Sequence, residues 1–451
     1  MNGPEQAFLD WLEAALESGD ALAADTDVRE HAIRRIRADL ESSAGALTSA
    51  TPGRHWAWAL TRLDREEDCY SWAERLVASP STRRDGVWMA VEAMRTWRAA
   101  PARLTPMLTG LLRDGRAGIR SAALQALAMS QSACRLAADD LATMLEELGP
   151  PAAIALGKAG DHRAVPHLVR LMLSGSDEPR LLQAFRAVAR SGADAEEPVS
   201  AARRILAAHP SSSPPELPMR VLAAFGPAAA AAVPELLATI EGAENDTPDL
   251  AFHVLGQIGP AAAAAIPTLR RYPSQVVMFA LLRTTVDRTI AERYLARLPD
   301  ELRGGRSAAM LLTWLAEHGG LDDRQHRQVR SLFRAPGSRQ VYSAAALWLH
   351  EGPAAAAELL DALPMYLTDD LYAPEVVRVF AMMGPHARPI LGRLDEFATS
   401  RHRAPFNAST PEAEIYADET VLAAVLAARD RITALPEFSG HRPTPTTTRS
   451  R

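Results

Sequence analysis

Two stretches of the sequence decide the fold: LAAFGPAAAAAVPELLATI at residues 222–240 and LGQIGPAAAAAIPTLRRY at residues 255–272. Both contain a leucine, three further residues, glycine and proline, a run of alanines, an aliphatic residue, a second proline and another apolar segment. Their glycines, Gly226 and Gly259, lie 33 residues apart. An internal repeat of this period is typical of stacked supersecondary units.

Each part of this repeat has a physical role in a pair of helices. Glycine ends the first helix because it adopts the left-handed conformation without strain. The second proline suits the first turn of the next helix, where its missing N–H costs little. One pair is too small to bury its own apolar residues, so neighbouring pairs must stack. The matching positions predict burial of six residues: Leu222, Leu236, Leu255, Ile258, Ile266 and Leu269.

The same spacing continues along the chain. Glycines recur at nearly the same interval on both sides of the two stretches, at Gly160, Gly192, Gly319, Gly352 and Gly384. The interval from Gly259 to Gly319 is almost twice as long, which fits two slightly short units without a clear glycine. Alternating runs typical of strands are missing. We therefore predict an all-α fold, an α-solenoid of stacked antiparallel helix pairs with a period of about 33 residues, within the range of known helical repeats.

The repeat resembles the HEAT-like family, in the short form found in phycobilisome-lyase-type proteins. The motifs that carry this resemblance are LGQIG and AIPTL at 255–259 and 265–269, their counterparts at 156–168 and 222–236, and GIRSAALQALA at 118–128. The clear matches cover residues 115–395, and weaker helix pairs extend them to 52–436. The resemblance implies a superhelix whose second helices line a concave face. It also implies two enzymatic precedents, alkylpurine DNA glycosylases and chromophore lyases.

The ends of the chain differ from the repeats. Residues 1–50 carry ten acidic and four basic side chains, so we predict an acidic N-terminal helical cap there. Residues 51–436 form the predicted array, with RHRAPFNASTPEA at 401–413 as a loop inside it. Residues 437–451 are of low complexity, and we expect a disordered tail.

Composition limits the classes of function. The net charge of −6 argues against a dedicated nucleic-acid binder. Only two cysteines occur, Cys69 and Cys134, without ligand or CxxC spacing, so a reducing cytoplasm is expected. We find no leader peptide and no uninterrupted apolar span, so no membrane contact is expected. Metal and phosphate-binding motifs are missing from the sequence, and we predict no metal, no cofactor and no catalytic residue.

Arginines form the first candidate binding surface. Residues 270–339 hold thirteen arginines and seven acidic residues, a local net charge of +6. Spacings of three and four residues place such side chains on one helix face. The candidate contacts are Arg293, Arg297, Arg327 and Arg330. This surface is either an ordinary solvated face or a docking site for an acidic partner, which the arginine fork suits.

Two further groups allow a structural and a functional interpretation. Trp56 and Trp58 either fill an irregular terminal repeat or offer an aromatic contact surface. Since they are two residues apart, they cannot both face the same side of a helix. The acidic pairs Asp139–Asp140, Asp322–Asp323 and Asp369–Asp370 fall at predicted helix starts or turns. There we expect them to cap free N–H groups and to suit the helix dipole rather than to perform acid–base catalysis.

The predicted function is that of a protein–protein interaction scaffold. Its partner is expected to be another protein with an acidic surface, bound on the concave face. One alternative is a HEAT-like enzyme, glycosylase-like or lyase-like. The glycosylase form would place Trp314 and Asp322 or Asp323 beside a flipped base. The other alternative is a nucleic-acid-binding module that uses the 270–339 arginines on phosphates.

Overall fold

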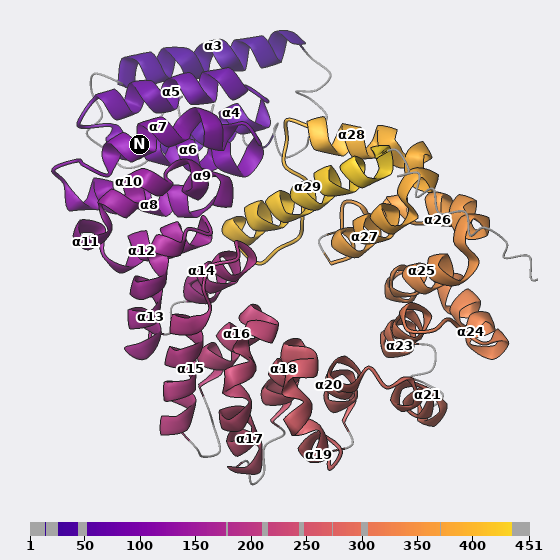
Figure 1. Ribbon diagram of the computed structural model, residues 1–451. Coiled ribbons are helices and arrows are strands. Elements are labelled where there is room, and N and C mark those ends of the chain that lie inside the picture. The colour runs from indigo at the N-terminus through magenta and orange to yellow at the C-terminus, as the bar shows by residue number, and fades with distance from the viewer. Residues whose placement is uncertain are drawn as a thin grey trace, which may run out of the picture. The chain divides into compact units, whose positions relative to one another are not determined.

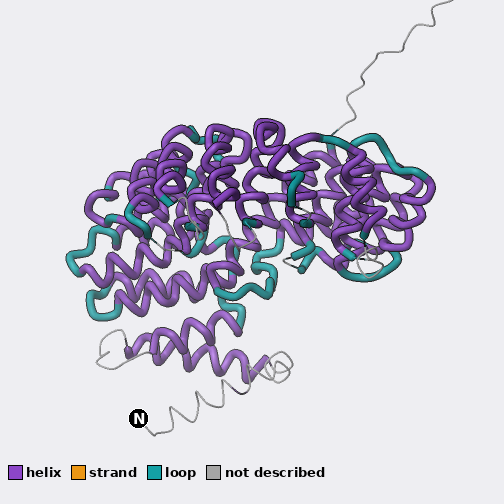
Figure 2. The backbone as a smooth tube through the Cα atoms, turned by 90° about the horizontal axis from the view of Figure 1, so that it is seen from below, coloured by secondary structure: helices purple, strands orange, loops and turns teal. Residues whose placement is uncertain are grey.

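The structure is a computed structural model that describes residues 14, 26–43, 52–176, 179–209, 215–242, 248–272, 274–298, 305–369 and 371–434. Every regular element in these residues is a helix, and Figure 2 shows helices joined by short loops. The extended contact found among them is an isolated antiparallel bridge between Trp97 and His402. The predicted all-α class is therefore confirmed for this part of the chain. The predicted tail at 437–451 lies outside the described residues, as does most of the predicted cap.

The chain divides into two compact units according to its internal contacts. Unit 1 consists of Met1–Leu298 and Ser400–Glu419, and unit 2 of Pro299–Thr399 and Thr420–Arg451. This division falls inside the predicted array at 51–436. It also falls inside the arginine-rich stretch at 270–339, whose two halves therefore belong to different units.

The helices of unit 1 are short and follow one another closely (Figure 1). They are α3 (Thr26–Ser43), α4 (Pro52–Arg62), α5 (Glu66–Ala78), α6 (Arg83–Thr96), α7 (Ala100–Leu111), α8 (Ala117–Ala128), α9 (Gln131–Leu136), α10 (Ala138–Thr143), α11 (Leu145–Leu148), α12 (Pro150–Lys158), α13 (Val165–Leu173), α14 (Pro179–Arg190), α15 (Glu196–Ala208), α16 (Glu216–Phe225), α17 (Val233–Gly242), α18 (Asp249–Ile258), α19 (Ile266–Leu269), α20 (Gln275–Thr285) and α21 (Arg288–Arg297). Three 3₁₀ helices connect the members of pairs: η1 (His162–Ala164), η2 (Gly226–Ala232) and η3 (Gly259–Ala265).

Unit 2 is built in the same way from fewer elements. They are α23 (Arg306–Glu317), α24 (Asp323–Phe333), α25 (Ser338–Glu351), η4 (Gly352–Ala355), α26 (Ala356–Ala362), η5 (Pro364–Tyr366), α27 (Ala373–Met383), η6 (Gly384–Ile390) and α28 (Leu391–Thr399). The last helix, α29 (Pro411–Thr433), contributes residues to both units.

First helices of successive pairs pack on one another in unit 1. The row runs α8, α12, α14, α16, α18 and α20, each in contact with the next. Second helices make their own contacts, α13 with α15 and α15 with α17. In unit 2 the first helices α23, α25 and α27 follow one another in the same way. Each pair thus buries its apolar residues against its neighbours, as the repeat predicts.

The repeat glycines take the conformation that the sequence predicts. All seven have a positive φ, from 54° at Gly226 and Gly384 to 122° at Gly319. Gly226 and Gly259 end α16 and α18, and their N–H groups donate to the carbonyls of Leu222 and Leu255. The alanine runs after them form the 3₁₀ helices η2 and η3, which lead the chain into the second helices.

In the repeat that lacks a glycine, the first helix ends at Val286. This residue ends α20 with φ 54° and ψ 29°, the left-handed conformation that glycine provides elsewhere. It stands one repeat length before Gly319 in the sequence. A β-branched residue is strained in this conformation, and the chain keeps the left-handed turn here although the glycine is missing.

The predicted core positions are buried, with one exception. Ile266 is partly buried at the first position of α19, so the prediction is wrong for this residue. The side chains of the other five are 0% exposed: Leu222, Leu236, Leu255, Ile258 and Leu269. Two helical glycines bring the first helices close together. A Cβ atom at Gly157 would lie 2.8 Å from Ala184 Cβ, and one at Gly256 would lie 3.0 Å from Ala280 Cα.

Two apolar segments, Glu216–Gly242 and Asp249–Leu269, reach the length and hydropathy of a membrane span. Each one contains a glycine with positive φ, Gly226 or Gly259, at which the first helix ends. Neither segment is therefore a single straight helix. The first helices of both segments pack on neighbouring first helices, α16 on α14 and α18, and α18 on α20.

Candidate functional site

Residues 400–419 return to the N-terminal half of unit 1. The N–H of Arg98 donates to the carbonyl of Arg401 at 2.8 Å, and the N–H of Arg403 donates to the carbonyl of Thr96 at 2.9 Å. These two bonds form the isolated bridge at the end of α6. They place the start of α29 beside helices that lie far before it in the sequence.

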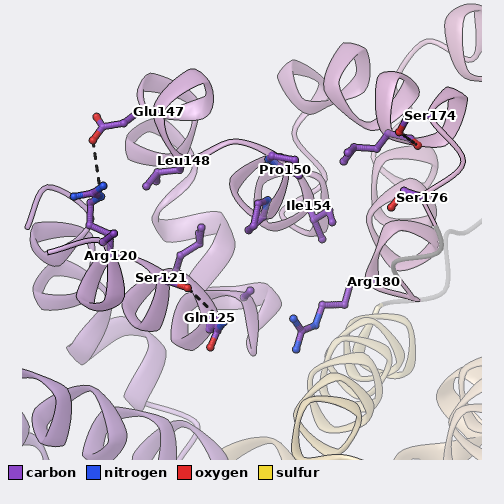
Figure 3. A pocket seen from close by; sticks show the side chains of 15 residues that line it. Arg120, Ser121, Gln125, Glu147, Leu148, Pro150, Ile154, Ser174, Ser176 and Arg180 are labelled. Atoms are coloured by element: carbon purple, nitrogen blue, oxygen red, sulfur yellow. Dashed lines mark hydrogen bonds and ion pairs between the residues drawn. The ribbon is translucent and has the colours of Figure 1, made fainter.

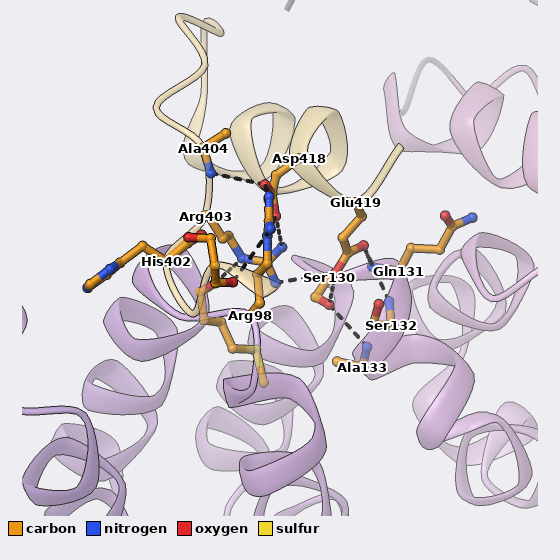
Figure 4. Close-up of polar contacts among 12 residues, drawn as sticks. Arg98, Ser130, Gln131, Ser132, Ala133, His402, Arg403, Ala404, Asp418 and Glu419 are labelled. Atoms are coloured by element: carbon orange, nitrogen blue, oxygen red, sulfur yellow. Dashed lines mark hydrogen bonds and ion pairs between the residues drawn. The ribbon is translucent and has the colours of Figure 1, made fainter. Parts of the chain in front are cut away.

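Asp418 of α29 is the centre of a buried ionic cluster (Figure 4). Its carboxylate is 0% exposed and accepts from Arg98 Nη2 at 2.6 Å and from Arg403 Nη1 at 3.0 Å. The N–H of Ala404 donates to the same carboxylate at 3.0 Å. Both guanidinium groups are nearly buried, so their charges depend on this carboxylate for compensation.

Glu419, the next residue, contacts the start of α9. It accepts from the Ser130 hydroxyl at 2.6 Å and from the Gln131 N–H at 2.8 Å. The Ser130 oxygen also accepts from the Ala133 N–H, which caps α9. A carboxylate in this position is favoured because the first N–H groups of a helix carry partial positive charge.

Glu412 completes the contact from the first turn of α29. It accepts from Lys158 Nζ at 2.6 Å and from Arg180 Nε at 2.8 Å. Lys158 is the only lysine of the chain, and its side chain is 5% exposed. Its ammonium also donates to the carbonyl of Ala128. We call Glu412, Asp418 and Glu419, with the groups that bind them, the carboxylate clamp.

A groove lies beside the clamp on the same unit. It has a volume of about 590 Å³, and Figure 3 shows Arg120 and Arg180 extending from different helices of its lining. Leu124 and Ile154 form a buried apolar floor. We call it the α8–α14 groove after the residues that line it: Ala117, Arg120, Ser121, Leu124, Gln125, Ala128, Glu147, Leu148, Pro150, Pro151, Ile154, Leu171, Ser174, Ser176 and Arg180.

The two arginines give the groove its charge. Arg120 donates to the carbonyl of Asp114 at 2.8 Å, and its Nε lies 3.9 Å from the carboxylate of Glu147. Arg180 belongs both to the groove and to the clamp, since it donates to Glu412. The groove therefore continues a surface that already binds a carboxylate.

Ionisation near this surface follows from burial and hydrogen bonding. The N–H of Arg116, together with the side chains of Arg116 and Arg83, lowers the pKa of Asp114 to about 2. Burial raises the pKa of the Cys134 thiol to about 12. Burial also lowers the pKa of His402, and the charge of Arg401 acts in the same direction.

The predicted arginine contacts do not lie in one unit. Arg293 and Arg297 are exposed on α21 of unit 1, and Arg327 is exposed on α24 of unit 2. Arg330 forms ion pairs within unit 2. Its Nε donates to Glu351 at 2.6 Å, and the side chain also pairs with Glu358. Two carboxylates hold Arg330, and its side chain is 29% exposed, so it is the least exposed of the four predicted contacts.

The predicted tryptophan contacts also differ from each other. Trp56 is 4% exposed and packs in the core of unit 1, so it is not available as a surface contact. Trp58 is partly buried, with the guanidinium of Arg62 5.6 Å from its ring. The two rings thus differ in exposure, which agrees with their spacing of two residues on one helix. For Trp56, packing is the correct interpretation.

The acidic pairs divide into caps and ion pairs. Asp322 forms a full capping box with Gln325, and the Asp369 carboxylate accepts from two following N–H groups. Asp139 and Asp140 lie in the first turn of α10, as predicted, but their carboxylates pair with Arg163 and Arg113, at 2.9 Å each, instead of forming a cap hydrogen bond. The Asp322 carboxylate is exposed and caps α24.

Sequence reasoning missed both the clamp and the groove. It predicted a loop at 401–413, whereas α29 already begins at Pro411. A single lysine among 48 arginines was the one available signal, and no pattern connected Lys158 with Glu412. Neither a scan against protein-family models nor a search of curated proteins finds a match to this chain.

Proposed function

We propose that this chain is an α-solenoid of HEAT-like helix pairs that serves as a cytoplasmic protein-binding module. One observation carries the proposal: the repeats of unit 1 hold an acidic helical segment through the carboxylate clamp. Three carboxylates within residues 412–419 are bound by arginine, lysine and hydroxyl groups of the repeats. A surface that binds such a segment within its own chain has the chemistry to bind one from a partner.

The order of packing supports the solenoid part of the proposal. First helices contact first helices in chain order from α8 to α20, and second helices do so from α13 to α17. Contacts of this kind, between neighbouring repeats, are characteristic of solenoids. Their stacked rows give such proteins extended surfaces, which mostly bind other macromolecules.

The two thiols support the cytoplasmic part. Cys69 and Cys134 are both buried and free. Burial raises the pKa of each thiol, which keeps both groups protonated and unreactive. Buried free cysteines agree with a reducing compartment, in which disulfides are rare.

The α8–α14 groove is the place at which we expect the partner. Its volume is within the range of typical binding sites. It combines an apolar floor with a few polar groups, which is the usual composition of a binding site. Arginine is also among the residue types that dominate interface energies.

Site-specific photo-crosslinking tests the proposed function. A photoreactive residue is placed at Gln125, exposed in the groove lining, and in a control chain at His253, exposed at the matching position of α18. Both chains are expressed in cells of the source organism and irradiated. We expect one or a few partner proteins to be crosslinked at position 125. None of these proteins should be crosslinked at position 253. Equal adducts at both positions, or none at 125 from a folded chain, would contradict the proposal.

A further inference from the structure

We propose that the α8–α14 groove binds an acidic amphipathic segment of a partner protein. Carboxylates of that segment would lie at Arg120 and Arg180, and its apolar side chains would cover Leu148 and Leu171, which are only partly buried. This inference rests on the proposed function, because it names the chemistry of the partner at that same groove.

Arg180 shows that this edge of the groove binds carboxylates. It donates to Glu412 at 2.8 Å, a carboxylate that it shares with Lys158. The side chain of Arg180 is 45% exposed, so its outer edge can be reached from the groove. A guanidinium has five N–H donors, so Arg180 can bind a further carboxylate in addition to the partners that it already has.

The surroundings of Arg120 point in the same direction. Its ion-pair partner, Glu147, lies at 3.9 Å, which is beyond hydrogen-bonding distance. The Glu147 side chain is 60% exposed and therefore loosely held. A ligand carboxylate can replace Glu147 at Arg120 and make the shorter, charge-assisted bonds that Glu147 does not make.

The apolar part of the lining determines the rest of the ligand. Leu124, Leu148, Ile154 and Leu171 come from four different helices and line the groove together with the two arginines. Side chains spaced three and four residues apart on a helix form a ridge that fits such a groove. A small inorganic anion would leave the partly exposed Leu148 and Leu171 uncovered, so a protein segment fits better than a free phosphate.

The lining also favours protein over single-stranded nucleic acid. Grooves for single strands present aromatic rings on which bases stack. The described lining residues include no phenylalanine, tyrosine, tryptophan or histidine. They combine arginine with aliphatic side chains, which suits an acidic helix such as the one in the clamp.

The probe for the test is a synthetic peptide with the sequence PEQAFLDWLEAALES, taken from residues 4–18. It has four acidic and no basic side chains, and its apolar residues recur at helical spacing. A fluorescein-labelled form is titrated with the full-length chain, and binding is followed by fluorescence anisotropy. A second peptide, with its four acids replaced by amides, measures the contribution of charge.

Two of the three variants form a matched pair, because each removes one positive charge. Arg120→Gln removes a charge from the groove, and Arg113→Gln removes one from an exposed arginine outside it, which pairs with Asp140. Gln125→Glu adds a negative charge to an exposed lining position and does not disturb the core. Circular dichroism confirms that each variant retains the helical content of the wild type.

We expect the acidic peptide to bind wild type and Arg113→Gln alike, and Arg120→Gln and Gln125→Glu about tenfold more weakly. The amide peptide should lose affinity to a similar degree. Three results would overturn the inference: no binding to wild type, equal binding to Arg120→Gln, or stronger Arg120-dependent binding of single-stranded DNA. A partner that still crosslinks at position 125 would then preserve the proposed function while this inference fails.

Discussion

Residues 196–285 and residues 52–143 of unit 1 are built from the same kind of helix pair but are held together differently. In 196–285, first helices pack on first helices through alanine, leucine and glycine, and Gly256 allows a close approach of α18 to α20. In 52–143, the returning segment 400–419 adds buried charges, with Arg98 and Asp418 separated by 320 residues in the sequence. Similar helices are thus held by local apolar contacts in one region and by distant ionic contacts in the other.

A repeat pattern in the sequence encodes the apolar packing between neighbouring helix pairs, but it does not encode the buried ion pairs. Apolar packing between neighbours recurs with the period of the chain and weakens little with salt or pH. A buried ion pair occurs once and depends on both of its partners, because either charge alone is costly in the interior. Substitutions in the two regions should therefore differ in size and in their dependence on solution conditions.

The largest effect is expected from Asp418→Ala in the clamp. Removal of this carboxylate leaves Arg98 and Arg403 buried without their shared acceptor, which should destabilise unit 1 by about 3–5 kcal/mol. Denaturant unfolding of the full-length chain, followed by tryptophan fluorescence, measures the loss. Glu414→Gln on the same helix is the matched control, since Glu414 is 40% exposed and lies 4.0 Å from Arg95. A loss no larger than that of the control would show that the clamp contributes little to stability.

A slightly smaller effect is expected from Leu255→Ala in the apolar region. Leu255 is 0% exposed, and the truncation should cost about 2–5 kcal/mol through lost burial and a residual cavity. Because no charge is involved, the loss should be the same at low and at high salt. Hydrogen exchange should accelerate mainly in α16, α18 and α20, which pack on one another. Uniform acceleration across the clamp region as well would mean that the two regions unfold together.

A pH-dependent effect is expected from Asp114→Asn, at the end of the clamp region that adjoins the groove. The pKa of Asp114 is lowered from 3.8 to about 2 by the Arg116 N–H and by the side chains of Arg116 and Arg83. A depressed carboxylate pKa stabilises the fold above pH 3.8, and this stabilisation is lost as the pH falls to about 2. The wild type should therefore exceed the variant in stability at pH 7, and the difference should disappear between pH 4 and pH 2. A difference that persists at pH 2 would assign the effect to packing.

The smallest effect, and one of opposite sign, is expected from Val286→Gly. The substitution relieves the left-handed strain of valine, about 1–2 kcal/mol, but increases the entropy lost on folding by up to about 1 kcal/mol. A net gain of at most about 1.5 kcal/mol should follow, measured as a higher midpoint of thermal unfolding. A loss of stability would indicate that the half-exposed valine side chain contributes packing that outweighs its strain.

The two regions also differ in how far the sequence could predict them. The glycine and proline positions predicted the helix pairs because each one acts on its own turn, as at Gly226 and Pro234. The clamp could not be predicted, because Arg98 and Asp418 are joined by the path of the whole chain and not by a local rule. Arg330 shows the same limit: its helix face was predictable, but its pairing with Glu351 and Glu358 was not.

A hydrogen-exchange footprint of the acidic peptide on the full-length chain tests the central claim most directly. Exchange is compared with and without saturating peptide, region by region. If the groove is the binding surface, the peptide should slow exchange in α8 and α12, whose residues line it, and leave α18 unchanged. Protection centred on α18 and α20, or no protection of α8 at saturation, would contradict the assignment of binding to the α8–α14 groove.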